Sequence, residues 1–295
     1  MNINNLTSVD SHMIQNKAGY PNKWLQRKIE HLALSAAAAE TYDEIYTKSS
    51  FATNVYMHYE MEIIEKYVSR APSHTLALDL GCGTGRGSIL LSTHFSHVYG
   101  YDFSPEMVHV ANDNKLQNNI DNISFKILDI EDNLLPVPDA SVAFVNTAFG
   151  MGSFVNNADK LIAEVNRVLL PGGIAIFSFY NSKSLINQLS FDWEPAMVVR
   201  ALDGEDALEV KFADHIYTIA ARSYNVNEVK DKLTRAFKDG VLDILTFPTL
   251  SALFPQSLFD NSETRQLCHN LDRLIASNLE IAAGSYIIAV CHKSE

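Results

Sequence analysis

A glycine-rich loop is the first feature of this sequence whose residue types and spacing could serve chemistry. It reads Leu78-Asp79-Leu80-Gly81-Cys82-Gly83-Thr84-Gly85. Glycines let the backbone turn sharply and lie against a ligand, and N–H groups at the start of a following helix face that ligand. A dinucleotide-binding turn would need glycine at position 86, which is Arg86, and the Lys-Ser/Thr ending of a phosphate-binding P-loop is absent from the motif. The spacing therefore predicts a ligand-binding loop of another kind.

An acidic residue, Asp102, ends the next apolar run, about 20 residues after Gly81. A carboxylate at that place in an α/β sheet can accept hydrogen bonds from both hydroxyls of a ribose. The alternative is that Asp102 caps the following helix. Ser104, with Pro105 at the first helical position, is the better cap, so the spacing favours the ribose role.

Strands alternate with helices through the middle of the chain, which predicts a mostly parallel sheet with helices on both faces. Apolar runs predict strands at 76–80, 98–102, 123–128, 142–146, 174–180, 215–221 and 286–291. Helical spacing predicts helices at 23–44, 55–68, 89–95, 105–116, 159–170, 226–237 and 267–279. Residues 241–260 form an apolar, proline-containing stretch, of which we interpret 245–259 as core, with a lipid site as the alternative.

The composition limits the partners. The chain has 295 residues with 23 basic and 35 acidic side chains, a net charge of −12, and no basic run, which argues against nucleic acid. Three cysteines without a CxxC pair argue against a disulfide framework or a structural zinc. With no signal-like N-terminus and no apolar stretch near the roughly 20 residues that span a bilayer, we expect a cytoplasmic protein without a membrane segment.

The ordered set of motifs resembles the class I S-adenosylmethionine-dependent methyltransferases, of the small-molecule type. The resemblance covers roughly residues 42–181 and is weaker beyond them. It begins with the pattern of Asp79 and the three glycines, and it ends with Glu164 to Gly173, which resembles the helix and turn before the family's fifth strand. Val142-Ala143 departs from the Phe-Asp that such families often carry there.

This resemblance implies a Rossmann-like α/β fold: a seven-stranded, mostly parallel sheet with helices on both faces, plus a helical N-terminal and inserted cap. It divides the chain into an N-terminal helical cap segment (1–70), a cofactor-binding core (71–181), an inserted cap segment (182–213) and a C-terminal completion of the sheet with further cap helices (214–295). It implies S-adenosylmethionine as the cofactor, S-adenosylhomocysteine as its product, and a small-molecule acceptor.

The resemblance also implies roles for single residues. Asp102 would bind the ribose, Phe103 and Met107 would flank the adenine, Asp129 would accept from the adenine amine, and the Ile130 N–H would donate to the ring. A tyrosine of the N-terminal helices, Tyr42, would cover the methionine end. The complete predicted cofactor set is Tyr42, Asp79, Gly81, Cys82, Gly83, Asp102, Phe103, Met107, Asp129, Ile130 and Asn146.

Plainer interpretations stand beside these. The glycines could form a simple tight turn, and Asp129 could be a solvated acid beside Glu131. Tyr42 and Tyr46 could be aromatic residues that only pack between helices. Cys82 could suggest redox or metal chemistry, but its place inside the glycine loop favours a small loop residue.

Methyl transfer needs alignment more than a protein nucleophile, because the sulfonium methyl is already activated. The catalytic group is therefore unknown from sequence, and His215 is the weak candidate for a general base. No His, Asp and Glu cluster predicts a metal. The acceptor pocket is expected to include Tyr46, Phe149, Tyr180 and Trp193, under a lid formed by residues 182–260 and the N-terminal helices.

Three other functions remain open at this stage. They are a peptide or protein methyltransferase, a non-catalytic S-adenosylmethionine-binding protein, and an NAD-dependent oxidoreductase. The last fits poorly because Arg86 stands where its third glycine is needed.

Overall fold

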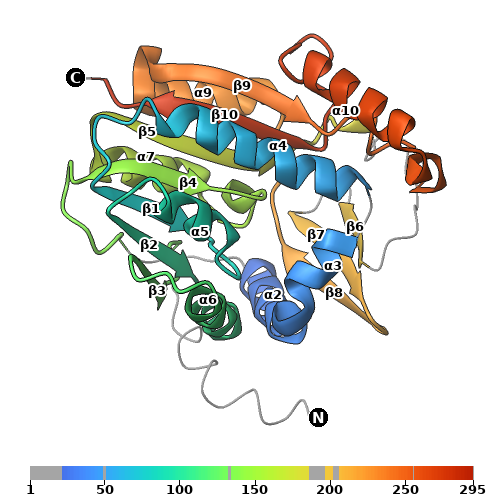
Figure 1. Ribbon diagram of the computed structural model, residues 1–295, viewed down its shortest axis with the longest axis horizontal. Helices are drawn as coiled ribbons and strands as arrows, with labels where there is room; N and C mark the ends of the chain where they lie inside the picture. Colours follow the sequence, from blue (N-terminus) through green and yellow to red (C-terminus); the bar gives the residue numbers. More distant parts are fainter. Residues whose placement is uncertain are drawn as a thin grey trace.

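The computed structural model describes residues 22–48, 51–131, 134–185, 197–201, 206–254 and 256–294. A large sheet runs through the molecule, and a small second sheet lies beside one end of it (Figure 1). The N-terminal helix of the described chain packs on the small sheet, while the C-terminal strand lies within the large one.

The large sheet has seven strands in the order β3-β2-β1-β4-β5-β10-β9. Strands β1 to β5 pair in parallel, whereas β10 is antiparallel to both of its neighbours. The strands are β1 (Leu76–Leu80), β2 (His97–Asp102), β3 (Ile123–Ile127), β4 (Val142–Thr147), β5 (Leu169–Tyr180), β9 (Val241–Phe247) and β10 (Tyr286–His292). The predicted Rossmann-like, mostly parallel seven-stranded sheet is confirmed.

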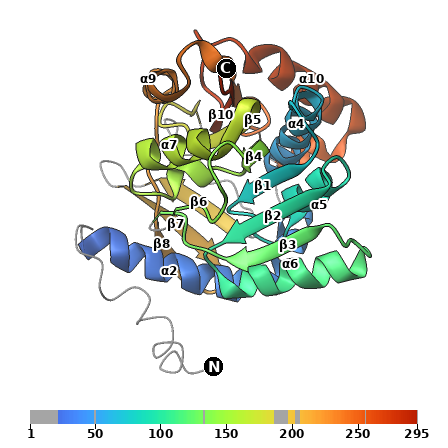
Figure 2. The same ribbon diagram turned by 90° about the vertical axis from the view of Figure 1, so that its left-hand side faces the viewer.

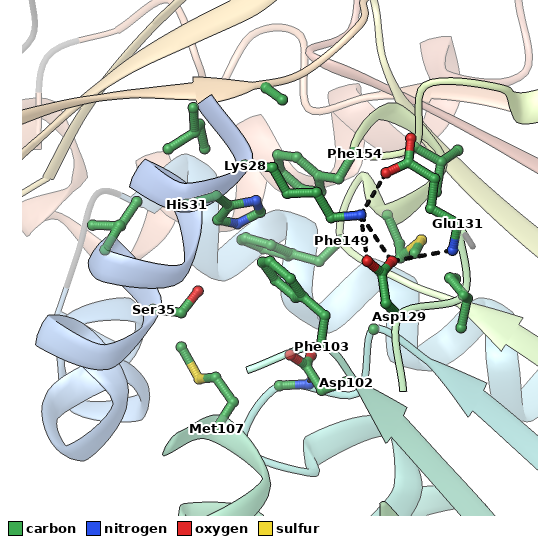
Figure 3. A pocket seen from close by; sticks show the side chains of 18 of the residues that line it. Lys28, His31, Ser35, Asp102, Phe103, Met107, Asp129, Glu131, Phe149 and Phe154 are labelled. Atoms are coloured by element: carbon green, nitrogen blue, oxygen red, sulfur yellow. Dashed lines mark hydrogen bonds and ion pairs between the residues drawn. The ribbon is translucent and has the colours of Figure 1, made fainter. Parts of the chain in front are cut away.

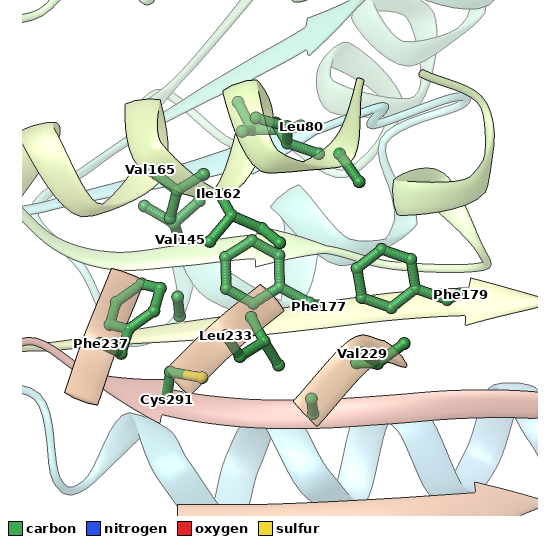
Figure 4. Packing of buried hydrophobic residues seen from close by; sticks show 14 of the residues in the cluster. Leu80, Val145, Ile162, Val165, Phe177, Phe179, Val229, Leu233, Phe237 and Cys291 are labelled. Carbon is green, nitrogen blue, oxygen red and sulfur yellow. The ribbon is translucent and has the colours of Figure 1, made fainter. Parts of the chain in front are cut away.

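Helices cover both faces of this sheet. Buried side chains of α4, α5 and α6 pack on one face and those of α7 and α9 on the other, where Phe177 meets Leu233 and Phe237 of α9 (Figure 4). The helices are α2 (Asn22–Ala38), α3 (Tyr42–Lys48), α4 (Phe51–Val68), α5 (Arg86–Ser92), α6 (Pro105–Gln117), α7 (Ala158–Val168), α9 (Val226–Phe237) and α10 (Ser262–Ala276). Short 3₁₀ turns are η2 (Ala39–Thr41), η3 (Met151–Ser153), η4 (Lys238–Gly240) and η5 (Gln256–Asp260).

The predicted cap of α6 is present. The Ser104 hydroxyl accepts from the Met107 N–H, and Pro105 takes the first helical position. This fixes the turn between β2 and α6, so the end of β2 and its Asp102 hold a defined place beside the glycine loop.

The second sheet corrects part of the strand prediction. Its strands β6 (Met197–Ala201), β7 (Ala207–Phe212) and β8 (His215–Ala220) pair antiparallel in sequence order. The segment predicted as the sixth strand of the main sheet is therefore β8 of a separate sheet, and β9 takes that place instead. Interpreting 245–259 as core is correct for its first part, because Leu245 and Phe247 at the end of β9 are buried.

The helix α2 lies between the two sheets, along α6 and β8 (Figures 1 and 2). Leu34 of α2 packs with Leu208, Val210, Ile219 and Ala221 in a small core of its own. The helix and the small sheet thus form one unit above the carboxyl ends of the parallel strands. The four-part division of the chain stays a prediction.

Candidate active site

A cleft opens where the carboxyl ends of β1 to β5 meet α2 and the small sheet (Figure 3). Ligands of open α/β sheets bind at this edge, since the connecting loops diverge there. A smaller hollow continues from it beneath α3, sharing Tyr42, Gly81, Gly83 and Phe149 with the main cleft. The main cleft is lined by Lys28, His31, Leu34, Ser35, Ala38, Tyr42, Gly81, Gly83, Tyr101, Asp102, Phe103, Met107, Leu128, Asp129, Ile130, Glu131, Ala148, Phe149, Met151, Phe154, Val155, Tyr180, Val210, Ile219 and Ala220.

The glycine loop forms the floor of both spaces. The N–H groups of Gly81 and Cys82 donate to the Tyr101 carbonyl at 2.7 and 3.0 Å, which ties the loop to β2. Gly83 has a φ of +52°, and a Cβ added there would meet nothing within 4 Å. The backbone at Gly83 is therefore bare toward the cleft, in a conformation that side chains rarely adopt, and a ligand can approach it closely.

Asp102 lies buried at the end of β2, directly beside this loop. Its carboxylate accepts from the Gly83 N–H at 2.8 Å and from the Ser104 N–H at 2.9 Å. Burial raises the pKa of Asp102 to about 6, against the lowering effect of these two hydrogen bonds. Helix α6 is capped by the Ser104 side chain and not by Asp102, so the carboxylate remains at the cleft wall.

Asp79 belongs to the smaller hollow. It accepts from the Ser88 hydroxyl at 2.7 Å and from the Asn146 amide at 2.8 Å, while burial raises its pKa. Asn146 itself is fully buried and is not among the lining residues of either space. Asn146 therefore orients Asp79 by this hydrogen bond and does not itself line the cleft or the hollow.

Asp129 and Ile130 line the far end of the cleft, but Asp129 has a neighbour that sequence analysis missed. The Lys28 ammonium of α2 reaches it at 2.7 Å and also reaches Glu131 at 2.5 Å (Figure 3). The Asp129 side chain is 25% exposed and paired with this ammonium, so Asp129 is a partly buried acid of an ion-pair cluster, and Glu131 beside it is only 6% exposed. Lys28 is about a hundred residues away in sequence, so no local pattern could have pointed to this cluster.

A second group missed from sequence is the row that α2 presents to the cleft: His31, Leu34, Ser35 and Ala38. Their spacing of three and four residues places them on one helix face. The sequence pattern predicts a helix at 23–44 but does not indicate that this face lines a cleft, because the small sheet that completes the cleft is formed by segments far along the chain.

The buried side chain of Glu60 on α4 holds the loop that follows β4 in place. Its carboxylate accepts from the Tyr56 hydroxyl at 2.5 Å, from the Phe149 N–H at 2.7 Å and from Arg86 at 3.2 Å. Phe149 lies at a φ of +52°, an uncommon value for a side-chain-bearing residue. The network therefore fixes Phe149 where it lines both spaces.

The other predicted residues fall in different places. Gly81, Phe103 and Met107 line the main cleft, as do Phe149 and Tyr180 of the predicted acceptor pocket, and Cys82 lines the smaller hollow. Burial raises the pKa of the Cys82 thiol well above its usual value, which favours the small loop residue over redox chemistry. Trp193 and the side chain of Tyr46 lie outside the described residues.

His215 is a correction. It starts β8 at its exposed end, with its ring 4.4 Å from that of Tyr217, and is not among the residues that line the cleft. Only Ile219 and Ala220, at the other end of β8, reach the cleft. The strand was placed in the wrong sheet, so the position of its first residue was wrong too.

Among the described residues no group of three His, Cys, Asp or Glu side chains could hold a metal ion. None of the helices in the described ranges is both long and apolar enough to cross a membrane.

Comparison with known proteins agrees with this geometry. Residues 78–177 match the family described as "Methyltransferase domain". A demethylmenaquinone methyltransferase of Thermus thermophilus is 28% identical over 137 residues, which cover 46% of this chain and 59% of that one. An arsenite methyltransferase of Halobacterium salinarum is 34% identical over 113 residues, 36% of this chain and 27% of that one. The chain spans between 22% and 59% of the length of the first relatives, which include a mimivirus protein named for RNA methylation.

Solved structures share the fold at low identity. A S-adenosylmethionine-dependent methyltransferase from Clostridium acetobutylicum superposes with a TM-score of 0.56 at 15% identity, covering 81% of this chain and 92% of the other. The DhpI-SAM-HEP complex superposes with a TM-score of 0.51 at 17% identity, covering 92% and 99%. Residues 78–177 thus match a methyltransferase domain, and the chain shares the fold of S-adenosylmethionine-dependent methyltransferases of known structure.

Proposed function

We propose that this protein transfers the methyl group of S-adenosylmethionine to a small-molecule acceptor. The observation that carries the proposal is the juxtaposition in one cleft of Asp102, the bare Gly83 backbone and a mostly apolar wall from α2 and β8. The first two suit a nucleoside, and the third suits an organic acceptor.

The residues present fit the cofactor from end to end. Asp102 would accept from the ribose hydroxyls, exchanging its bond to Gly83. Phe103 and Met107 would flank the adenine, whose amine would share Asp129 with Lys28. The amino-acid end would enter the smaller hollow, where a carboxylate, Asp79, and a guanidinium, Arg86, are both present.

When bound, the cofactor supplies an electrophilic methyl group. The residues of this chain then contribute alignment and shelter: Tyr42 and Phe149 line both spaces, at the junction where the amino-acid end meets the acceptor side. Alignment of reacting atoms alone accounts for large rate gains, so a protein nucleophile is not needed.

A small acceptor is favoured over a polypeptide or nucleic acid because α2 and the small sheet close the cleft from above. Macromolecular acceptors usually need an open groove, and a phosphate backbone needs basic residues. In the described part of the cleft wall the one lysine, Lys28, is already paired with Asp129 and Glu131.

The test is transfer of a labelled methyl group from S-adenosylmethionine into fractions of a cell extract. We expect label in the small-molecule fraction. Label confined to protein would support the peptide alternative, and label confined to RNA would support a nucleic-acid acceptor. Binding of the cofactor without label in any fraction would indicate the non-catalytic alternative.

A further inference from the structure

His31 lies in the middle of the cleft, on the face of α2 that looks toward the glycine loop (Figure 3). Its ring centroid is 5.0 Å from that of Phe103 and 4.8 Å from that of Phe154. Among the described residues, no hydrogen bond or ion pair engages either ring nitrogen. The ring is partly exposed to the cleft, so a bound ligand can reach its nitrogens.

The protonation state of this ring is set by its surroundings. Burial, and to a lesser degree the positive charge of Lys28, lower the pKa of His31 to about 4. The imidazole is then neutral at physiological pH, and one nitrogen is free to accept a proton. One helical turn further, buried Ser35 presents a second polar group to the same space.

Beyond His31 and Ser35, the cleft wall on this side of α2 is apolar or neutral. Its walls come from α2, η3 and its flanks, the end of β5, and the small sheet. They are Leu34, Ala38, Met151, Phe154, Tyr180, Val210, Ile219 and Ala220. The charged lining residues Asp102, Asp129, Glu131 and Lys28 lie on the side of the cleft near Phe103, where Lys28 offsets two of the carboxylates. A charged acceptor would lose its hydration here without meeting an opposite charge.

Building on the proposed function, we propose that the acceptor is an uncharged, largely apolar molecule with an acidic hydroxyl, such as a phenol, and that His31 accepts the hydroxyl proton. An acidic hydroxyl is favoured because a weakly basic imidazole is matched best by a donor that gives up its proton readily. The apolar walls would bind the remainder of the molecule.

The step balances as a displacement. The acceptor oxygen forms a bond to the methyl carbon, and the carbon–sulfur bond breaks with its electron pair going to sulfur. The hydroxyl proton passes to the free nitrogen of His31 and from there to solvent. The products are a methyl ether, S-adenosylhomocysteine and a proton, and no oxidant or metal is required.

The first experiment measures binding with S-adenosylhomocysteine at saturation. A panel of one- to three-ring phenols is compared with carboxylates and ammonium compounds of the same ring systems. We expect the best phenol to bind at least tenfold more tightly than its charged counterparts. Equal or tighter binding of either ion, or no binding of any phenol, would overturn the proposed substrate class.

The second experiment replaces His31. His31→Phe keeps an aromatic ring without its nitrogens, and should weaken phenol binding at least tenfold and methyl transfer at least a hundredfold. His31→Gln keeps a hydrogen-bond acceptor that takes no proton, so phenol binding should stay within threefold while transfer is lost. The control is His109→Phe on α6, whose side chain is 78% exposed and where no change is expected.

The affinity for S-adenosylhomocysteine separates the possible failures. It should stay within twofold in both His31 variants. A tenfold loss of this affinity in both variants would mean that His31 contacts the cofactor, and it would overturn this inference alone. Methyl transfer by His31→Gln at the wild-type rate would also overturn it. Absence of S-adenosylhomocysteine binding by the wild-type protein would overturn the proposed function itself.

Discussion

Asp102 illustrates how far single residues could be predicted. Its proposed ribose role follows from local facts: an apolar strand, a glycine loop about 20 residues earlier, and a serine that already caps the next helix. The structure adds that its carboxylate bridges Gly83 and Ser104. His31 and Lys28 could not be predicted in this way, because their partners come from elements far along the chain and only tertiary packing brings them together.

Replacing Asp102 tests the ribose assignment at this scale. Asp102→Asn keeps the shape but removes the charge that strengthens two expected hydrogen bonds, each worth about 1.5–3 kcal/mol. We expect titration calorimetry to show S-adenosylhomocysteine binding weakened at least tenfold. Asp121→Asn, which alters an exposed acid before β3, is the control, and equal affinities for the two variants would remove Asp102 from the site.

The raised pKa of Asp102 also predicts a pH dependence. The free protein holds a proton on Asp102 below about pH 6, whereas ribose hydroxyls donate to the charged carboxylate, so binding must release that proton. Affinity for S-adenosylhomocysteine should therefore be constant above pH 6 and fall up to about tenfold for each unit below it. In Asp102→Asn this fall in affinity below pH 6 should be absent. A fall of the same size in that variant would assign the titration to another group.

At the scale of elements, the core strands and helices were predictable and the small sheet was not. Strands β1 to β5 are short apolar runs bounded by turns, which is a local signal. The segment of β8 was predicted as a strand of the main sheet and β9 was not predicted as a strand, because the sheet that a short strand joins is decided by its neighbours in the fold. Asp243 in β9, which pairs with Lys66 of α4 at 3.0 Å, interrupts the apolar pattern. Of the segments predicted to form a lid, 182–260 and the N-terminal helices, the elements α2, β7 and β8 line the described cleft.

The attachment of α2 should depend on one buried charge. Lys28→Met leaves Asp129 and Glu131 side by side without a cation, and breaking a buried pair costs about 3–5 kcal/mol. We expect urea unfolding to show a loss near the lower end of that range, since Asp129 is partly exposed.

A surface pair provides the comparison for that loss. Lys232→Met removes the pair with Asp159, whose side chain is 49% exposed, and should cost less than about 1 kcal/mol. Equal losses in the two variants would mean that α2 is held by its apolar contacts alone.

At the scale of the whole molecule, the order of the seven strands places the four predicted cofactor motifs at one edge of the sheet. The glycine loop follows β1, Asp102 ends β2, Asp129 follows β3, and Phe149 follows β4. Parallel pairing turns these four separate stretches of sequence into one wall. The acceptor wall comes from α2 and the small sheet, and its residues follow no comparable sequence pattern, so the acceptor could not be predicted from sequence alone.

The most direct test of the central claim is the stability of the whole protein with and without ligand. At a concentration about 100 times its dissociation constant, S-adenosylhomocysteine should raise the free energy of unfolding by roughly 2.7 kcal/mol. NAD at the same concentration should leave it unchanged, because Arg86 replaces the third glycine of a dinucleotide loop. Stabilisation by NAD together with none by S-adenosylhomocysteine would contradict the account.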